Sequence, residues 1–227
     1  MKLEKITSGR SYDDACATAH ALDLIGERWA LLVLRELMLG ARRFGDLRAS
    51  LPGISANVLT QRLEGLESAG IVRRRKLSPP ASVQVYELTA WGAEAEPIVL
   101  ALGRWAVRSP WHDPSLPLSP VALMLSFRAK FDPARARRVR VSIGFRFGDE
   151  TFSVMVRDAA LTTARADFGA TEAQVSGAPG SVAALIYGKV RLEKLERQGA
   201  LAVTGDRRML QRFVDLFELP SKADTST

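Results

Sequence analysis

We predict an α+β fold, with a mainly helical first half joined to a second half built on a mainly antiparallel sheet. Three observations support this prediction. Helical periodicity dominates the first half and is interrupted by one pair of short strand patterns. Four prolines within residues 110 to 120 break that pattern at mid-chain. Beyond them, residues that alternate between apolar and polar predict strands with short helices between them.

The most informative element of the first half is a helix that follows a Pro-Gly turn at residues 52 and 53. Ser55 has a hydroxyl suited to capping the helix start, and Gly70 is the residue type expected just beyond the helix end. The apolar side chains of this helix recur at the i, i+4, i+7 spacing of a buried stripe: Leu59, Leu63 and Leu66. We therefore expect its polar residues to face outward.

A second helical segment, residues 43 to 51, precedes this helix across the turn. Two short helices joined by a tight turn, the second polar at its start, are typical of a helix-turn-helix. Residues 71 to 76 and 83 to 88 then predict two strands joined by a turn at residues 78 to 82, and the first strand is basic. A helix-turn-helix followed by a basic hairpin predicts a winged helix. The alternative is an ordinary helical hairpin within a core.

Two earlier helices are expected to support this unit. The first runs through residues 15 to 25, with Ser11 and Asp14 as a capping box, and the second covers residues 28 to 39.

A longer helix, residues 89 to 108, is predicted after the hairpin, with a kink at Pro97. Its apolar band has no obvious partner within a small winged domain: Trp91, Ile98, Leu102 and Trp105. We expect this helix and the helix that contains Cys16 to form a homodimer interface. The alternative is packing on the second half of the chain.

The charge of the chain is concentrated on the predicted winged helix. The formal net charge is +7, and residues 42 to 76 hold eight Arg or Lys against three acids, which gives 8 − 3 = +5. Phosphate binding requires such an excess, although a solvated basic face is the alternative. No apolar run reaches the roughly 18 residues of a membrane span, and no signal-peptide core begins the chain. We therefore expect a cytoplasmic protein.

Residues 12 to 108 resemble HxlR-type winged-helix transcriptional regulators. The resemblance rests on Cys16 and the segment from Ala21 to Leu37, on Arg43 to Leu47, on the turn from Leu51 to Ser55, and on further motifs: Leu59 to Leu63, Tyr86 to Thr89, Gly92, Pro97 and Trp105. It implies homodimeric binding to a double-stranded DNA operator, usually for repression and sometimes for activation. It also implies that the helix from Ser55 enters the major groove and that the hairpin is the wing.

The candidate DNA contacts follow from side-chain chemistry. The polar start of the helix offers groups for base edges in the major groove, and Arg62 suits guanine or phosphate. Gln84 of the hairpin, or a residue at the tip of the wing, is a candidate for the minor groove. Cations on the hairpin and before the first helix of the pair are candidates for phosphates. The full set is Arg42, Arg43, Ser55, Asn57, Thr60, Gln61, Arg62, Arg73, Arg74, Arg75, Lys76 and Gln84.

The second half predicts a sheet with interspersed helices. A helix is expected at residues 121 to 131, and strict alternation predicts a strand at residues 138 to 147. Gly148 and Asp149 form a hairpin signal before the return strand. The remaining patterns predict strands at 161 to 165, 173 to 175 and 200 to 203, and helices at 181 to 187, 192 to 197 and 206 to 217.

The end of this half resembles sterol-carrier-protein-type domains, over roughly residues 120 to 219. The resemblance rests on the spacing of a strand, a helix and the glycines Gly188, Gly199 and Gly205. It implies a helix-backed sheet around an apolar pocket for lipid-like effectors. The candidate lining residues, which would otherwise fill a core, are Leu123, Phe127, Phe131, Phe145, Phe152, Val154, Leu185 and Phe213.

These patterns divide the chain into four segments. We expect a DNA-binding and dimerisation domain at residues 1 to 109, a Pro-rich linker at 110 to 120, a sterol-carrier-like domain at 121 to 219 and a disordered tail at 220 to 227.

An enzyme is not expected. The two histidines, His20 and His112, fall in different predicted domains, and no HExxH, CxxC, P-loop or dinucleotide pattern is present. We expect no catalytic residue, no cofactor and no metal. One alternative function is a lipid carrier in which the second domain is primary.

Cys16, the only cysteine, supports a second alternative, a sensor of oxidants or electrophiles. His20 lies four residues later on the same helix face, where an imidazolium would lower the thiol pKa, while Asp13 and Asp14 would raise it. Otherwise Cys16 is a small buried side chain near the dimer interface.

Overall fold

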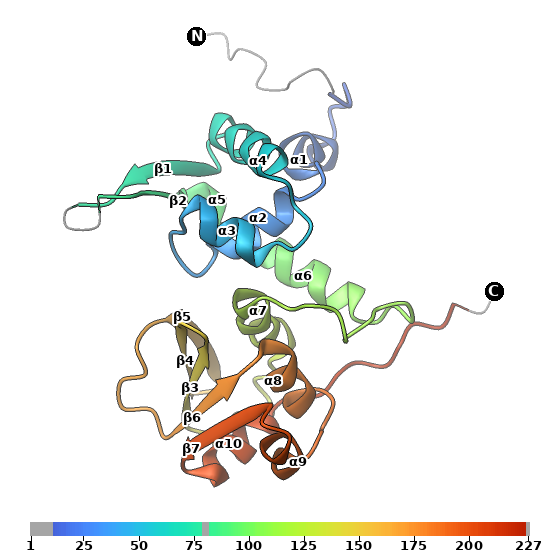
Figure 1. The fold of residues 1–227 in the computed structure, drawn as a ribbon. Helices are drawn as coiled ribbons and strands as arrows, with labels where there is room; N and C mark the ends of the chain where they lie inside the picture. The colour runs from blue at the N-terminus through green and yellow to red at the C-terminus, as the bar shows by residue number, and fades with distance from the viewer. Residues whose placement is uncertain (1–10, 79–81, 226–227) are drawn as a thin grey trace. The chain divides into compact units, whose positions relative to one another are not determined.

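The computed structural model describes residues 11 to 78 and 82 to 225, and the chain divides into two compact units, Met1–Val99 and Leu100–Thr227 (Figure 1). The elements of the first unit are α1 (Ala17–Ile25), α2 (Ala30–Leu37), α3 (Phe44–Ser50), α4 (Ala56–Ser68), β1 (Val72–Lys76), β2 (Gln84–Leu88) and α5 (Ala90–Ala93). The helix α6 (Glu96–Ala106) begins in the first unit and continues into the second. The α+β fold class is confirmed.

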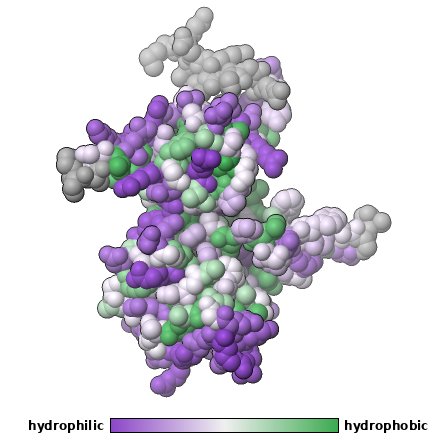
Figure 2. Space-filling view, viewed as in Figure 1, coloured by the Kyte–Doolittle hydropathy of each residue, from purple (hydrophilic) through white to green (hydrophobic). Residues whose placement is uncertain are grey.

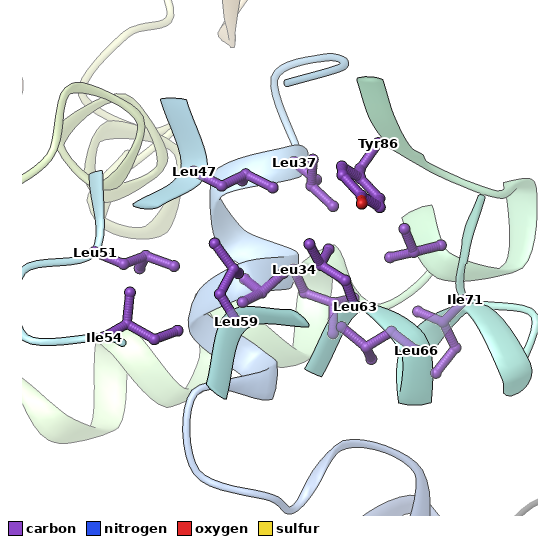
Figure 3. Packing of buried hydrophobic residues seen from close by; sticks show 12 residues of the cluster. Leu34, Leu37, Leu47, Leu51, Ile54, Leu59, Leu63, Leu66, Ile71 and Tyr86 are labelled. Carbon is purple, nitrogen blue, oxygen red and sulfur yellow. The ribbon is translucent and has the colours of Figure 1, made fainter. Parts of the chain in front are cut away.

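The core of the first unit forms around the apolar stripe of α4. Leu59, Leu63 and Leu66 are buried and contact the buried Val33 and Leu34 of α2 in one cluster (Figure 3). The predicted stripe is therefore confirmed, and the leucines determine how α4 is turned about its own axis.

The ends of α4 follow from the sequence signals. Ser55 Oγ accepts a hydrogen bond from the backbone N–H of Val58 at 3.2 Å, so Ser55 caps the helix as predicted. Gly70 follows the helix with a φ of +71°, a conformation that favours glycine.

The predicted cap of α1 is wrong. The helix begins at Ala17 rather than at residue 15, with Cys16 as its N-cap residue. The side chain of Ser11 faces Asp23 instead, at 3.4 Å between Oγ and Oδ2. Asp13, which lies between the predicted cap and the helix, has a φ of +49°. This value is outside the range of a right-handed helix, so the helix cannot begin at Ser11.

The wing hairpin is antiparallel, with Val72 opposite Leu88 and Lys76 opposite Gln84. Part of the predicted turn, residues 79 to 81, lies outside the described residues. The helix predicted from residue 89 to 108 is in fact two helices, because a turn separates α5 from α6 and Pro97 lies in the first turn of α6.

A hydrogen-bonded cluster joins the hairpin to α5. Thr89 Oγ1 donates to the Gly70 carbonyl at 2.7 Å and accepts from the N–H of Gly92 at 3.0 Å. A Cβ on Gly92 would lie 2.1 Å from the carbonyl oxygen of Ile71. Glycine is therefore required at this position.

The second unit contains a five-stranded sheet in the order β5-β4-β3-β6-β7. The pairing of β3 with β6 is parallel and the other pairings are antiparallel. Its elements after α6 are α7 (Pro120–Lys130), β3 (Val141–Phe147), β4 (Glu150–Arg157), β5 (Ala160–Arg165), β6 (Ala173–Gly177), α8 (Pro179–Ile186), α9 (Leu192–Arg197), β7 (Leu201–Gly205) and α10 (Arg207–Val214). The strand predicted from residue 138 begins only at Val141, because residues 133 to 138 form turns.

One face of β3 belongs to an aromatic core. Phe145 lies 5.6 Å from Phe127 of α7 and 6.0 Å from Phe213 of α10, measured between ring centroids. On the other face, Gly144 leaves room for Phe168, because a Cβ on Gly144 would lie 2.5 Å from that ring. Side chains thus cover both faces of the central strand.

We predict that Gly92→Ala destabilises the first unit by about 1 to 3 kcal/mol, because the added methyl group forces Ile71 and α5 apart. Gly65→Ala is the matched control. Gly65 is exposed within α4 and a Cβ there meets nothing within 4 Å, so alanine should stabilise by about 0.5 to 1 kcal/mol. Urea unfolding followed by hydrogen exchange of peptides from the first unit measures both. Equal effects of the two substitutions would contradict the packing described for Gly92.

Candidate nucleic-acid interface

The polar start of α4 is exposed. Ser55, Asn57, Thr60 and Gln61 are all accessible, on the side of the helix opposite the leucine stripe. The Ser55 hydroxyl already accepts the capping hydrogen bond, whereas the amides of Asn57 and Gln61 have the donor and acceptor pair that matches an adenine edge.

Arg62 is tied to another part of the unit. Its Nη2 lies 3.1 Å from Glu27 Oε2, between α1 and α2, and its side chain is 23% exposed. An arginine held in this way positions α4 against the rest of the unit, and it must leave Glu27 before it can reach a base.

Arg42 is buried, contrary to its predicted role as a surface cation. The residue is 5% exposed, and its Nη2 donates to Ser50 Oγ at 2.9 Å and to the carbonyl oxygen of Asp46 at 3.4 Å. Its backbone exchanges hydrogen bonds with Tyr86 at 2.9 and 2.8 Å. Arg42 therefore joins α3 to β2, and only its neighbour Arg43 is exposed.

The wing arginines have carboxylate partners. Arg73 and Arg75 lie on either side of Glu87, with Nε to oxygen distances of 2.8 and 3.1 Å. Arg74 forms a two-pronged pair with Glu67 of α4, at 3.0 and 2.7 Å. Hydrogen bonding from Arg75, and then from Arg73, holds the pKa of Glu87 below its usual value.

These carboxylates reduce the charge of the wing. Arg73, Arg74, Arg75 and Lys76 contribute +4, and Glu67 and Glu87 contribute −2, which leaves +2. Lys76 is exposed, and the described part of the chain contains no ion pair to it. Figure 2 shows hydrophilic residues on the visible side of the β1–β2 hairpin. Sequence reasoning missed Glu67 and Glu87 as partners, although Glu87 lies opposite Arg73 in the hairpin register.

Gln84 is exposed at the far end of β2. Its Nε2 donates to the hydroxyl of Tyr86 at 3.2 Å, which holds the amide over the hairpin.

Cys16 is exposed at the start of α1. The nearby backbone N–H groups of Ala19 and then Thr18, at the helix start, lower the pKa of its thiol. The backbone amides of the helix start, rather than the expected imidazolium of His20, are the cause of the lowered pKa of Cys16. Cys16 is exposed in the single chain, and its burial at a dimer interface stays an alternative to a sensing role.

The residues predicted to line an apolar pocket instead fill the core of the second unit. Leu123, Phe127, Phe145, Phe152, Val154, Leu185 and Phe213 are at most 4% exposed. Phe127 contacts Phe213 edge-on at 5.3 Å. The eighth residue, Phe131, is partly exposed and lines a separate cavity.

Two further observations concern the described residues only. No group of three or more His, Cys, Asp or Glu side chains in residues 11 to 78 and 82 to 225 is arranged to hold a metal ion. None of the helices in those ranges is both long enough and apolar enough to cross a membrane.

Both parts of the chain match known families. Residues 24 to 113 match the model described as HxlR-like helix-turn-helix, and residues 118 to 223 match the model described as alkyl sulfatase C-terminal. The HTH-type transcriptional regulator sll1512 of Synechocystis is 44% identical over 88 residues, 38% of this chain and 64% of that protein. The HTH-type transcriptional regulator YvaP of Bacillus subtilis is 38% identical over 96 residues, 42% of this chain and 86% of that protein.

The solved structure of the reduced form of the transcriptional regulator YodB from B. subtilis is 30% identical. It covers 44% of this chain and 100% of its own, with a TM-score of 0.39.

We predict that Glu87→Gln destabilises the first unit at neutral pH by about 1 kcal/mol or less, since its partners are largely exposed. The pKa of Glu87 is lowered by folding, so its contribution is complete above the usual value of about 4.3 and disappears as the pH falls through the lowered value. Urea unfolding at a series of pH values from 7 to 3.5 measures the difference. A difference between wild type and variant that stays constant to pH 3.5 would contradict the ion pairs.

Proposed function

The chain belongs to the HxlR-like helix-turn-helix family of transcriptional regulators, and we propose that it binds operator DNA as a homodimer and represses the genes that the operator controls. The proposed DNA-binding and dimerisation domain is residues 1 to 109, and the proposed second domain is residues 121 to 219. The similar proteins are bacterial, so the proposed site of action is the cytoplasm.

The observation that carries this proposal is the exposure of the polar start of α4 opposite a fully buried leucine stripe. A helix in the major groove must pack on its domain through the face turned away from DNA, while its N-terminal side chains contact base edges. Asn57, Thr60 and Gln61 are the proposed base-reading residues. Ser55 caps the helix and brings backbone N–H groups toward a phosphate.

The wing and Arg43 are the proposed phosphate contacts. Exposed ion pairs such as those of Arg73, Arg74 and Arg75 stabilise by only about 0 to 1 kcal/mol each, so a phosphate can displace the carboxylates at little cost. Lys76 is available directly. Gln84 is proposed to approach the minor groove, and Arg42 is left out because it is buried.

The proposed dimer interface uses apolar surface on α6. Ile98, Leu102 and Trp105 recur at the i, i+4, i+7 spacing and are 49%, 44% and 76% exposed. Such a stripe on a helix is expected to be covered in the assembled protein. Trp91 of α5 and Leu22 of α1 are exposed as well and are proposed to extend the interface.

The second domain is proposed to receive an effector. A sterol-carrier-like or lipid-carrier role that uses the predicted apolar pocket requires the aromatic core to open, because Phe127, Phe145 and Phe213 already contact one another. An effector at any site regulates only if it binds the DNA-competent and DNA-incompetent forms with different affinities.

A second candidate function is thiol-based sensing through Cys16. The exposure of the thiol and the backbone N–H groups of the helix start, which lower its pKa, favour this candidate. At pH 7, iodoacetamide should modify Cys16 faster than it modifies the cysteine of an unstructured peptide. Cys16→Ser should leave DNA affinity intact and remove its response to oxidants. A wild-type DNA affinity that oxidants leave unchanged would reject this candidate.

We predict that Arg74→Ala weakens binding to every DNA sequence and reduces the slope of log K against log salt by about 1, because one phosphate contact is lost. Arg157→Ala is the matched control: it removes an exposed arginine of the second unit that is not proposed to contact DNA, so the salt slope should not change. Fluorescence anisotropy with fragments selected from the host genome, at several salt concentrations, measures both. An unchanged slope for Arg74→Ala would remove Arg74 from the proposed phosphate contacts.

We predict that Asn57→Ala relaxes the base preference at one operator position by about 1 to 3 kcal/mol while leaving affinity for random DNA unchanged. Glu64→Ala, on an exposed part of α4 that is not proposed to contact bases, is the control. Competition binding with single-base operator variants gives the preference. Equal losses on operator and random DNA would remove Asn57 from the base-reading set.

A further inference from the structure

A cavity of about 530 Å³, widely open to solvent, lies in the second unit, outside the aromatic core. The end of α6, the end of α7 and the C-terminal segment form its walls. Pockets of roughly 300 to 1,000 Å³ are typical of small-molecule sites. The cavity is thus large enough for a small organic ligand.

The C-terminal segment is fastened in place. Lys222 Nζ donates to the carbonyl oxygens of Val107 and Ser109 at 3.2 and 2.9 Å, and the N–H of Ala223 donates to the Arg108 carbonyl at 2.7 Å. Figure 1 shows this segment running back toward the chain that follows α6. Residues 222 and 223, which belong to the predicted disordered tail, thus form hydrogen bonds with the chain that follows α6, next to the part of the C-terminal segment that lines the cavity.

The cavity combines apolar surface with positive charge. Val107, Phe131 and Leu219 contribute apolar side chains, and Arg104, Arg108 and Lys130 contribute three cations. The one carboxylate of the lining, Glu218, forms an ion pair with Arg135, which does not line the cavity. The cations therefore exceed the negative charge available to them.

Lys130 is the most unusual of these cations. It is only partly exposed, and burial lowers the pKa of its ammonium group to about 8. Its Nζ lies 4.9 Å from the ring centroid of Tyr187, and no carboxylate pairs with it in the described part of the chain. A partly buried cation without a counter-charge is costly, and a bound anion would offset that cost.

We propose that this cavity binds a small organic carboxylate with an apolar tail. The carboxylate is held by Lys130 with Arg104 and Arg108, and the tail lies on Phe131, Val107 and Leu219. Arg104, Val107 and Arg108 precede residue 118, where the match to the alkyl sulfatase C-terminal family begins, so the site combines two parts of the chain.

The site touches α6, the helix that carries the proposed dimer stripe. A ligand held there contacts Arg104 and Val107 within one turn of Trp105. The regulatory consequence of binding rests on the proposed function, whereas binding itself does not.

The test uses decanoate and decanol, which share one tail and differ in charge, with the full chain and isothermal titration calorimetry below the micelle concentration of decanoate. We expect one decanoate per chain and at least tenfold weaker binding of decanol. Lys130→Gln should weaken decanoate at least tenfold, and so should Arg104→Gln, which replaces an exposed residue and cannot unfold the core. Arg157→Gln, an exposed cation outside the lining, should leave the affinity unchanged.

Equal affinity for decanol and decanoate, unchanged decanoate binding by both lining variants, or no decanoate binding at millimolar concentration would each overturn the proposal. DNA affinity is measured separately with and without decanoate. Decanoate binding without operator binding would contradict the proposed function and leave the pocket intact, and the reverse outcome would contradict only the pocket.

Discussion

The contact between the leucine stripe of α4 and the buried face of α2 determines what the first unit can present to DNA. Each buried leucine contributes about 1.5 to 3 kcal/mol relative to an exposed one, so three of them fix the rotation of α4 firmly. Because the helix cannot turn about its axis, Asn57, Thr60 and Gln61 must face outward. The cap at Ser55 then sets where the helix begins.

Ion pairs and hydrogen bonds within the first unit determine which of its cations are available to DNA. Residues 42 to 76 carry an excess of positive charge, but many of these cations have partners within the unit. Arg42 and Arg62 bind other residues of the unit, and the wing arginines form ion pairs with Glu67 and Glu87. The exposed pairs are weak, whereas the buried hydrogen bonds of Arg42 are costly to lose. The cations therefore fall into two groups, with the wing available for phosphates and Arg42 reserved for the fold.

The sequence predicts elements well where a local signal determines them. The α4 cap and stripe, the wing hairpin and the β3–β4 hairpin at Gly148 all have such signals, and the structure contains them. The prediction that Ser11 caps α1 is wrong because Asp13 adopts a positive φ between Ser11 and the helix. The kink predicted at Pro97 is absent because proline is equally suited to the first turn of a new helix, and Pro97 lies in the first turn of α6.

Features that depend on tertiary contacts could not be predicted in this way. Nothing near Arg42 in the sequence shows that Ser50 and the carbonyl oxygen of Asp46 will enclose it. The apolar residues of the second unit are the same residue types whether they fill a core or line a pocket, and the ring contacts decide for a core. The cavity beside Lys130 requires residues 104 to 108, 129 to 131 and 218 to 221 to meet, which only the fold shows.

The central claim is that α4 and the wing together form the surface that meets DNA. The most direct measurement is the change in backbone amide NMR shifts when operator DNA is added to the full chain. We predict that the largest changes occur at residues 55 to 61 and 72 to 76, with small changes at the strands of the second unit. Changes confined to the second unit, for example on the arginine-rich α10, would contradict the account.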